Sequence, residues 1–388
     1  MQRSYDVIVI GGGIMGLSTA YYLVKKGKRV LLLEKNELGS GASGACDEMI
    51  LLQSKKPGNL LTMAIESLEM YRGLSEELKM EINFEVRGGM VFIENYEQLR
   101  VMEEFVERQR SFGLNVEIID RGKVYEKQPY ARDGILASTY SPSDAQVYPF
   151  KVMRGYLARG IEQGLEIRKK VEISHIIQKN GYWKIELEDQ APVEAEYIVN
   201  AAGAWAGEIG KMIDIEIPVR PIRGQVAVTE PIAGIGETNV WSAEYIVRKI
   251  KPELSLRRDQ RCEELGIGFA LSQAATGNFL LGSSREEAGF SKSTTFEVVE
   301  KIGQQVVEFF PIFKKVNIIR TFAGLRPATP DGKPILGEVA GREGFFIAAG
   351  HEGDGVALAP LTGKMTADLI CGQRLSKEFQ ALKLDRFL

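Results

Sequence analysis

The sequence predicts a mixed α/β protein with two domains, one built on a parallel sheet and one on an antiparallel sheet. A chain of 388 residues exceeds what one simple core holds. Residues 7–10 form a β-branched run, three glycines follow, residues 14–26 have helical spacing and residues 29–34 form a second apolar run. This βαβ unit implies a parallel sheet. In the middle of the chain, residues 215–229 and 266–282 alternate as antiparallel strands do.

The other patterns indicate that the chain leaves the first domain and returns to it twice. A buried strand at residues 345–349, followed by a helix at 356–371, belongs beside the first βαβ unit. Between them, helical spacing and short strands alternate, with helices expected at 60–78, 96–112, 150–163 and 296–309 and a strand expected at 84–93. We expect a discontinuous first domain of residues 1–85, 145–215 and 325–388, and a second domain of residues 86–144 and 216–324.

Composition excludes several classes of function. The formal net charge of −3 gives no reason to expect nucleic acid as a partner. Cys46, Cys262 and Cys371 lie far apart and only two histidines exist, so we expect no disulfide scaffold, no metal site and no resident iron–sulfur cluster. Residues 7–24 are mostly apolar, but three glycines interrupt them. We therefore expect a buried strand and helix there, no transmembrane segment, and a cytoplasmic location.

The first turn carries a dinucleotide-binding fingerprint. Gly11 permits the tight turn, Gly13 lets the backbone approach a pyrophosphate, and Gly16 lets the helix pack closely on the strand. The N-terminus of the helix then offers free N–H groups to the phosphates. Glu34 ends the second strand, where a carboxylate accepts hydrogen bonds from ribose hydroxyls and repels a 2′-phosphate. The ligand is therefore FAD or NAD, not NADP.

No second glycine fingerprint of this kind follows a later strand, so one dinucleotide is expected. Four further segments favour FAD because of what they resemble. They are GSGASG at residues 39–44, YIVNAAGAW at 197–205, GLRPATPDGKPILG at 324–337 and AAGHEGDGV at 348–356. Together they resemble the D-amino-acid oxidase superfamily of flavoproteins, in its glycine oxidase and sarcosine oxidase branch, over residues 5–372. The resemblance implies a two-domain fold of the glutathione reductase type with a Rossmann-like FAD-binding domain.

Within that branch, the chain looks most like the β subunits of heteromeric amino-acid dehydrogenases. Examples are proline and hydroxyproline dehydrogenase, hydrogen cyanide synthase and heterotetrameric sarcosine oxidase. The segments that carry this likeness are CD at residues 46–47, LLQSKKP at 51–57, GFALSQ at 268–273 and GSSR at 282–285. The resemblance implies a small amino-acid substrate, a partner flavoprotein subunit and a small iron–sulfur subunit that receives the electrons.

The resemblance also implies which residues hold the FAD. For the ADP half it implies Gly11, Gly13, Gly16, Glu34 and Lys35, and for the chain to the flavin Ser43, Gly44 and Met49. For the adenine it implies Val171, and for the pyrophosphate Ala202, Gly203 and Trp205. For the pyrimidine end of the flavin it implies Gly350, His351, Gly353, Asp354, Gly355 and Val356. The last segment is a strand, a glycine loop and a helix, which would place N–H groups beside the negative charge of reduced flavin.

Two residues are candidates for catalysis. Arg326 follows an apolar strand, and a guanidinium matches a substrate carboxylate in a bidentate fork. The alternative for Arg326 is an internal salt bridge, for example to Asp331. His351 lies in the flavin loop, and its alternative is a purely structural hydrogen bond to the backbone. His175 alternates within a strand, and we assign it no role.

The reaction that the resemblance implies is hydride transfer from the α-carbon of an amino acid with a neutral amine to the flavin. Two departures from relatives bear on it. Gly324 stands where some relatives tether flavin through a cysteine, so non-covalent FAD is expected. Leu280 stands where some oxidases place a lysine that activates oxygen, which favours a partner protein as acceptor. The alternatives are a self-sufficient oxidase that makes hydrogen peroxide, a non-catalytic FAD-containing assembly subunit, and an NAD-dependent dehydrogenase.

Overall fold

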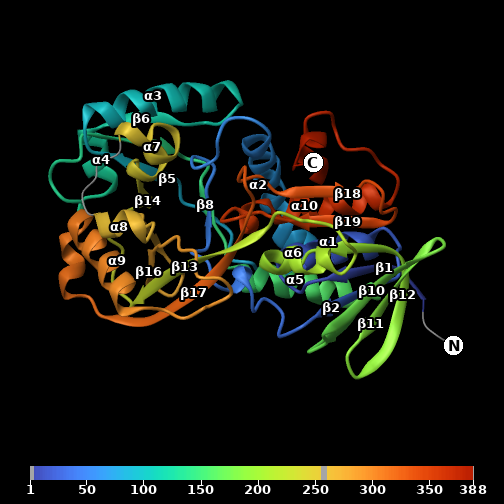
Figure 1. Cartoon of the computed structure of the whole chain (residues 1–388). Helices are drawn as coiled ribbons and strands as arrows, with labels where there is room; N and C mark the ends of the chain where they lie inside the picture. Colours follow the sequence, from blue (N-terminus) through green and yellow to red (C-terminus); the bar gives the residue numbers. More distant parts are fainter. Residues whose placement is uncertain (1–3, 255–259, 388) are drawn as a thin grey trace.

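A computed structural model describes residues 4–254 and 260–387, which form two domains with the chain passing repeatedly between them (Figure 1). The first domain has a parallel sheet flanked by helices, and the second has a large mixed sheet with helices packed around it. This arrangement confirms the mixed α/β, two-domain fold predicted from the sequence. In the described ranges, no helix is both long and apolar enough to span a membrane.

The sheet of the first domain is built around the predicted βαβ unit. Its parallel strands, in spatial order, are β9 (Glu166–Lys169), β2 (Val30–Glu34), β1 (Ser4–Ile10), β12 (Gln190–Asn200) and β19 (Phe345–Ala349). At the outer edge, β18 (Ile335–Glu338) pairs antiparallel with β19. Two antiparallel strands, β10 (Ile173–Lys179) and β11 (Tyr182–Leu187), extend from the first half of β12.

Both faces of the parallel sheet are covered, which explains why β1, β2 and β19 contain continuous apolar runs. On one face, Val9 and Leu32 pack among α1 (Ile14–Lys25), α2 (Asn59–Leu78), α5 (Pro149–Glu162) and α10 (Gly355–Ile370). On the other face, Ile8 packs with Trp183 of β11 and with α6 (Ala206–Lys211). Each such side chain stabilises the fold by about 1.5–3 kcal/mol. The sheet is therefore a rigid support for the loops at its carboxyl edge.

The second domain contains an eight-stranded sheet whose pairs are antiparallel except for one. Its spatial order is β17 (Ile318–Ala328), β13 (Arg220–Thr229), β16 (Phe279–Gly282), β15 (Ala270–Gln273), β14 (Asn239–Ser242), β5 (Gly89–Ile93), β7 (Ala137–Ser141) and β6 (Glu117–Asp120). Helix α9 (Phe296–Phe309) packs on the sheet through Val298, Ile302 and Val306, and α3 (Tyr96–Ser111) packs through Met102 and Phe105 at the other end. A small sheet of β3 (Met49–Ile50), β8 (Ala145–Gln146) and β4 (Glu85–Val86) lies where the chain changes domain.

The structure differs from the expectation in several details. The strand predicted at residues 84–93 is two strands, β4 and β5, because Gly88 adopts a positive φ of 74° between them. Helices α4 (Arg121–Lys127) and α7 (Glu244–Ile250) were not predicted, since each is too short to show a clear period. Strand β17 continues to Ala328 and so crosses the predicted boundary between residues 324 and 325.

Candidate active site

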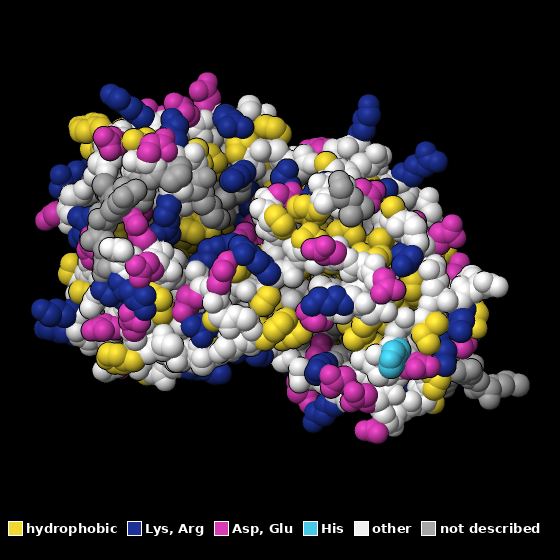
Figure 2. Space-filling model, viewed as in Figure 1, with side chains coloured by type: hydrophobic (Ala, Val, Ile, Leu, Met, Phe, Trp, Pro, Cys, Tyr) yellow, Lys and Arg dark blue, Asp and Glu magenta, His cyan; other side chains and the backbone are white. Residues whose placement is uncertain are grey.

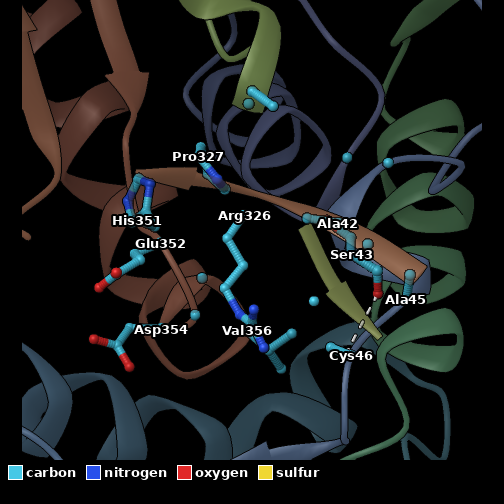
Figure 3. A pocket seen from close by; sticks show the side chains of 18 of the residues that line it. Ala42, Ser43, Ala45, Cys46, Arg326, Pro327, His351, Glu352, Asp354 and Val356 are labelled. Atoms are coloured by element: carbon cyan, nitrogen blue, oxygen red, sulfur yellow. Dashed lines mark hydrogen bonds between the residues drawn. The ribbon is translucent and has the colours of Figure 1, made fainter. Parts of the chain in front are cut away.

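A cavity of about 620 Å³ opens between the two domains, and both contribute to its wall. The first domain supplies the glycine turn after β1, the end of β2 and the N-terminus of α10. The second domain supplies parts of β13, β14, β17 and α7. Figure 3 shows Arg326 projecting from β17 into this cavity, beside the loop that carries His351, Glu352 and Asp354. The site is thus composite, with one end in each domain.

The glycine turn forms the phosphate-binding end of the cavity. Gly11 has a φ of 111°, and a Cβ atom there would lie 2.5 Å from the carbonyl oxygen of Ala201. A Cβ atom on Gly16 would overlap the carbonyl oxygen of Gly11, which is the close helix–strand contact predicted for this position. Only glycine fits at both positions, and the turn leads directly into the N-terminus of α1, where free N–H groups bind a pyrophosphate.

Glu34 lies at the cavity end of β2, where a ribose is expected. Its carboxylate accepts hydrogen bonds from the backbone N–H of Gly12 at 2.6 Å and of Asn36 at 2.7 Å. These bonds fix the carboxylate beside the glycine turn. Next to it, Lys35 pairs with Glu172 at 2.5 Å, and Val171 lines the wall. The donors, the acid and the apolar wall fit the ADP half of a dinucleotide such as FAD.

Most of the predicted cofactor residues line the cavity. Those that do are Gly11, Gly13, Glu34, Lys35, Ser43, Val171, Ala202, Gly203, Trp205, His351, Gly353, Asp354, Gly355 and Val356. Four do not. Gly16 and Gly350 act through backbone packing, since a Cβ atom on Gly350 would lie 2.6 Å from the Thr329 methyl group. Gly44 packs against Phe150, and Met49 is buried in β3, so neither reaches the cavity in the way expected from the resemblance.

The loop before α10 is fixed by a buried ion pair that sequence reasoning missed. Lys55 is only 2% exposed, and its Nζ atom lies 2.6 Å from Oδ1 of Asp354, the residue before the first turn of α10. Backbone carbonyls of Gln53 and Lys55 accept hydrogen bonds from Gln109 at 2.9 Å. The chain around residue 55 therefore holds the N-terminus of α10 in place against the cavity.

His351 faces the cavity but is bonded to the protein. It is 3% exposed, and its Nε2 atom lies 3.1 Å from Oγ1 of Thr362 in α10. Burial lowers the pKa of this imidazole to about 3, so it is uncharged at neutral pH. A side-chain bond to α10, rather than the backbone bond considered from the sequence, shapes the loop. The ring is held as a neutral group next to the cofactor loop.

Arg326 has no carboxylate partner among the described residues. Its guanidinium donates to the carbonyl oxygen of Ser284 and to Oγ of Ser283, both at 2.8 Å. The sequence-based alternative, a salt bridge to Asp331, is wrong, because Asp331 pairs with Arg386 at 2.9 Å. A Cβ atom on Gly224 of the neighbouring strand would collide with the guanidinium, so a larger residue there would displace the Arg326 side chain. The positive charge of Arg326 is therefore available to an anionic ligand.

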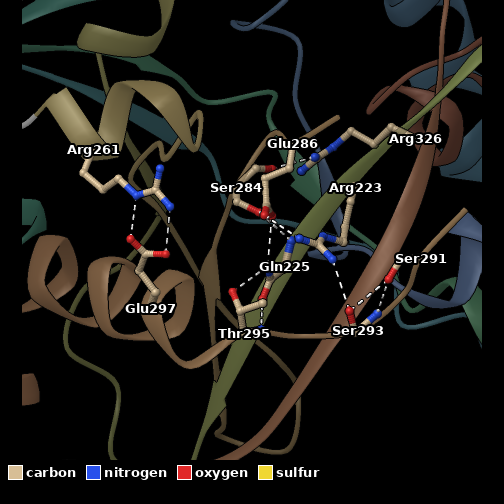
Figure 4. Close-up of polar contacts among 10 residues, drawn as sticks. All are labelled: Arg223, Gln225, Arg261, Ser284, Glu286, Ser291, Ser293, Thr295, Glu297 and Arg326. Carbon is tan, nitrogen blue, oxygen red and sulfur yellow. Dashed lines mark hydrogen bonds and ion pairs between the residues drawn. The ribbon is translucent and has the colours of Figure 1, made fainter. Parts of the chain in front are cut away.

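A buried polar cluster fixes Ser284, whose carbonyl oxygen accepts a hydrogen bond from Arg326 (Figure 4). Oγ of Ser284 donates to Glu286 at 2.5 Å, and Glu286 also accepts from Arg223 at 2.6 Å and from Gln225 at 2.9 Å. Burial raises the pKa of Glu286, but hydrogen bonds from Arg223, Ser284 and Gln225 outweigh it and hold the pKa below its usual value. The charged carboxylate thus fixes the segment that orients Arg326.

Several other residues that line the cavity at the Arg326 end were not predicted from the sequence. Trp241, Tyr245 and Ile246, from β14 and α7, line the cavity near Phe269. Arg285 also lines it, but forms an ion pair with Glu352. No spacing in the sequence relates these residues, because they come from separate strands and a short helix. Their common position is a property of the folded sheet.

The structure also bears on the two departures noted in the sequence. A Cβ atom on Gly324 would lie 2.6 Å from the carbonyl oxygen of Ala45, so a larger side chain there requires the backbone to move. Leu280 is buried but does not line the cavity, so its identity says little about oxygen. The nearby Cys46 lines the cavity as a thiol, because burial raises its pKa to about 12.

A metal centre was sought in the part of the chain that the structure describes. Within residues 4–254 and 260–387, no group of three or more His, Cys, Asp or Glu side chains is arranged to hold a metal ion. On the face shown in Figure 2, basic and acidic side chains are interspersed rather than gathered into one patch of a single sign. Such a surface gives no sign of a nucleic-acid interface.

Comparison with known proteins agrees with this site. Residues 6–369 match the family model described as DAO, FAD dependent oxidoreductase. Glycine oxidase of Bacillus licheniformis is 29% identical over 395 residues, covering 100% of this chain and 98% of that protein. The hydrogen cyanide synthase subunit HcnC of Pseudomonas aeruginosa is 26% identical, covering 100% and 97%.

Solved structures show the same fold over the whole chain. Glycine oxidase from Geobacillus kaustophilus superposes with a TM-score of 0.89 at 24% identity, covering 100% of both chains. L-proline dehydrogenase from P. horikoshii gives 0.88 at 24% identity, covering 100% of this chain and 98% of that one. With the glycine turn, Glu34 and the loop before α10 in place, the chain belongs to the DAO family of FAD-dependent oxidoreductases.

Proposed function

We propose that the enzyme oxidises the C–N bond of a small secondary amino acid, such as proline or hydroxyproline, and passes the electrons to a partner subunit. The observation that carries this proposal is Arg326, a guanidinium at the cavity with no carboxylate partner among the described residues. Its two serine contacts leave the rest of its donor fork for a ligand. A substrate carboxylate fits that fork in a bidentate manner.

The wall beside Arg326 supports a substrate with an apolar body. Val226, Trp241, Ile246 and Phe269 line this part of the cavity. A ring of methylene groups gains from such contacts, by about 0.8 kcal/mol for each buried CH₂ group. Glycine, which has no side chain, gains nothing there. Arg285 does not compete for the carboxylate, because Glu352 neutralises it.

The protein groups at the site orient the substrate and need not move a proton. FAD, when bound, supplies the acceptor for the hydride from the α-carbon. His351 is neutral and lies within hydrogen-bonding distance of Thr362, so we assign it to shaping the loop rather than to acid–base chemistry. The substrate binds with a neutral amine, because only a nitrogen lone pair lets the C–N bond become an imine. A cyclic imine is the product from proline.

The proposal includes a division of labour between the domains. Residues 1–85, 145–215 and 325–388 form the FAD-binding domain, and residues 86–144 and 216–324 form the substrate-binding domain. Arg326, on the part of β17 that crosses the boundary, binds the substrate carboxylate from the first of these domains. Around the FAD, Glu34 and Lys35 bind the ribose side, Ala202 and Gly203 flank the pyrophosphate, and the loop from Gly350 to Val356 meets the pyrimidine end. The FAD is non-covalent, which is supported by the close approach of Gly324 to the Ala45 carbonyl oxygen and by the high pKa of Cys46.

The lysines that line the cavity bear on the electron acceptor. Lys35 and Lys292 are the lysines among the described residues that line the cavity, and neither lies on the sheet beside Arg326. A partner flavoprotein with an iron–sulfur subunit is the acceptor we favour. The competing function is a self-sufficient oxidase that makes hydrogen peroxide, and the likeness of the whole chain to glycine oxidases favours it.

An anaerobic titration of the yellow protein tests the substrate class. L-proline, D- and L-hydroxyproline, sarcosine and glycine would be added separately while the flavin absorbance is recorded. We expect bleaching by proline or hydroxyproline at lower concentrations than by glycine. Bleaching by glycine alone would contradict the secondary amino acid. Rapid, stoichiometric peroxide on admitting air would contradict the partner acceptor, and a flavin that none of them bleaches would favour a purely structural FAD.

A further inference from the structure

One segment of the second domain crosses to the cofactor end of the cavity. Residues 286–295 follow β16 of the mixed sheet and reach the first domain, where Lys292 contacts Ser40 and Phe290 contacts Trp205. Arg223 fixes its base through backbone bonds of 2.9 Å in each direction with Glu286. The side chain of Arg223 also donates to Oγ of Ser293 at 3.2 Å, as Figure 4 shows. We call residues 286–295 the crossing segment.

Lys292 of the crossing segment reaches the phosphate-binding end of the cavity. We call the glycine turn after β1 and the adjoining residues 39–43 the phosphate cradle. Its Nζ atom donates to the carbonyl oxygen of Ser40 at 3.0 Å, and Lys292 lines the cavity. The residue before Ser40, Gly39, donates its backbone N–H to the carbonyl oxygen of Gly12 at 2.9 Å. Three residues after Ser40, Oγ of Ser43 accepts from the N–H of Ile14 at 3.0 Å. The ammonium group therefore lies beside the turn that receives the pyrophosphate.

A second contact places the crossing segment over the same end of the cavity. The ring of Phe290 stacks on Trp205 with 5.3 Å between centroids and 20° between planes. Trp205 belongs to the turn after β12, which borders the glycine turn because Gly11 approaches Ala201 closely. Phe290 and Lys292 thus touch the first domain on two sides of the cradle.

Charge balance points to a role for this lysine. The described residues that line the cavity include four cations, which are Lys35, Arg285, Lys292 and Arg326. Lys35 pairs with Glu172, Arg285 pairs with Glu352, and Arg326 lies at the substrate end. Lys292 alone of the four is beside the cradle with only a neutral carbonyl as its partner in the described structure. The pyrophosphate of FAD carries two negative charges that the N-terminus of α1 offsets only in part.

We infer that Lys292, carried by the crossing segment of the substrate-binding domain, binds the pyrophosphate of FAD and so completes the cofactor site from the other domain. The stack of Phe290 on Trp205 keeps the segment over the cradle. Cofactor retention thereby depends on the second domain, even though the dinucleotide fingerprint lies wholly in the first. This inference does not depend on which amino acid is oxidised.

The rate at which the holoenzyme releases FAD tests the inference. Free FAD is more fluorescent than bound FAD in most flavoproteins, so release after dilution is followed directly, without substrate. We expect Lys292→Met to release FAD about five to ten times faster than the unmodified protein at low salt, since one charge contact is lost. Lys292 is exposed, so this difference should shrink in 1 M salt. Phe290→Ala should also release FAD faster, but with little dependence on salt.

Lys314→Met is the matched control, because Lys314 is an exposed lysine of the same domain that does not line the cavity. It should release FAD within twofold of the unmodified protein, and Lys292→Arg should retain most of the affinity. Equal release rates for Lys292→Met and Lys314→Met would overturn the inference. A faster release from Lys292→Met that is the same at low and high salt would overturn it as well, because an electrostatic contact requires the salt dependence.

Discussion

The two ends of the cavity are built in different ways. The cofactor end comes from short contiguous segments, in which a strand, a glycine turn and a helix follow one another along the chain. The substrate end is assembled from single residues on β13, β14, β17 and α7. The first end depends on backbone shape, so glycines define it. The second depends on side chains held by other side chains, so most of its residues, apart from Arg326, are found only in the folded sheet.

A substitution at Gly11 is the most severe test of the cofactor end, which depends on backbone shape. Gly11→Ala introduces a Cβ atom 2.5 Å from the carbonyl oxygen of Ala201 at a φ of 111°. We expect FAD binding to weaken by about 3 kcal/mol, or roughly a hundredfold, as measured by fluorescence titration of the apoprotein. Gly73→Ala is the control, since Gly73 has open space around it on α2 and the change should leave FAD affinity unaltered. Equal FAD affinities for the two variants would refute the strict need for glycine.

His351 tests whether the cofactor loop depends on an uncharged ring. Because burial lowers the pKa of His351 from 6.5 to about 3, the unfolded chain takes up a proton first as the pH falls below 6.5. This histidine should therefore cost about 2 kcal/mol of stability between pH 7 and pH 5, and the cost continues to grow toward pH 3. Thermal unfolding at several pH values checks this.

The variant His351→Asn should lose that part of the pH dependence. His175→Asn is the matched control, since the side chain of His175 is largely exposed. Other buried acids, such as Asp144 with a pKa raised to about 6 by burial, contribute slopes of the opposite sign. They cancel when variants are compared with the unmodified protein. Identical slopes for His351→Asn and the unmodified protein would argue against a buried neutral imidazole.

A substitution at Glu286 tests the substrate end, where we expect a smaller change in ligand affinity. Glu286→Gln weakens the charge-assisted bonds that fix Ser284, and so loosens the seat of Arg326. We expect the half-saturating substrate concentration in the anaerobic titration to rise about tenfold, or about 1.4 kcal/mol, while FAD release stays unchanged. Glu287→Gln is the control, because Glu287 is exposed and pairs only with Arg220 on the surface. A parallel loss of FAD in Glu286→Gln would indicate general unfolding instead of a positioning role.

What could be predicted from the sequence follows the same division between the two ends. The βαβ start, Gly11, Gly16, Glu34 and the loop before α10 were predictable, because each depends on neighbours within a few residues. The free guanidinium of Arg326 was predicted, but its seat on Ser283 and Ser284 was not, since those residues lie more than 40 positions away.

Other parts of the site give no local signal at all. Trp241 and Tyr245 reach the cavity only because β14 pairs with β5 and β15 and the short α7 follows. Lys55 reads as a surface lysine within SKKP, and only the folded chain places it 2.6 Å from Asp354. For Gly44 and Met49 the opposite holds. The segment that contains them was predicted to line the cavity, but these two residues do not line it, whereas Ser43 does.

The most direct test of the account is an anaerobic titration with L-proline of three proteins, which are the unmodified enzyme, Arg326→Met and Arg320→Met. Arg320 lies on the same strand as Arg326 but is exposed. We expect the flavin of the unmodified enzyme and of Arg320→Met to be bleached at similar concentrations of L-proline. Arg326→Met should keep its FAD but need roughly a hundredfold more substrate, since a desolvated ionic partner is lost. Bleaching of Arg326→Met at the concentration that suffices for the unmodified enzyme would contradict the central claim.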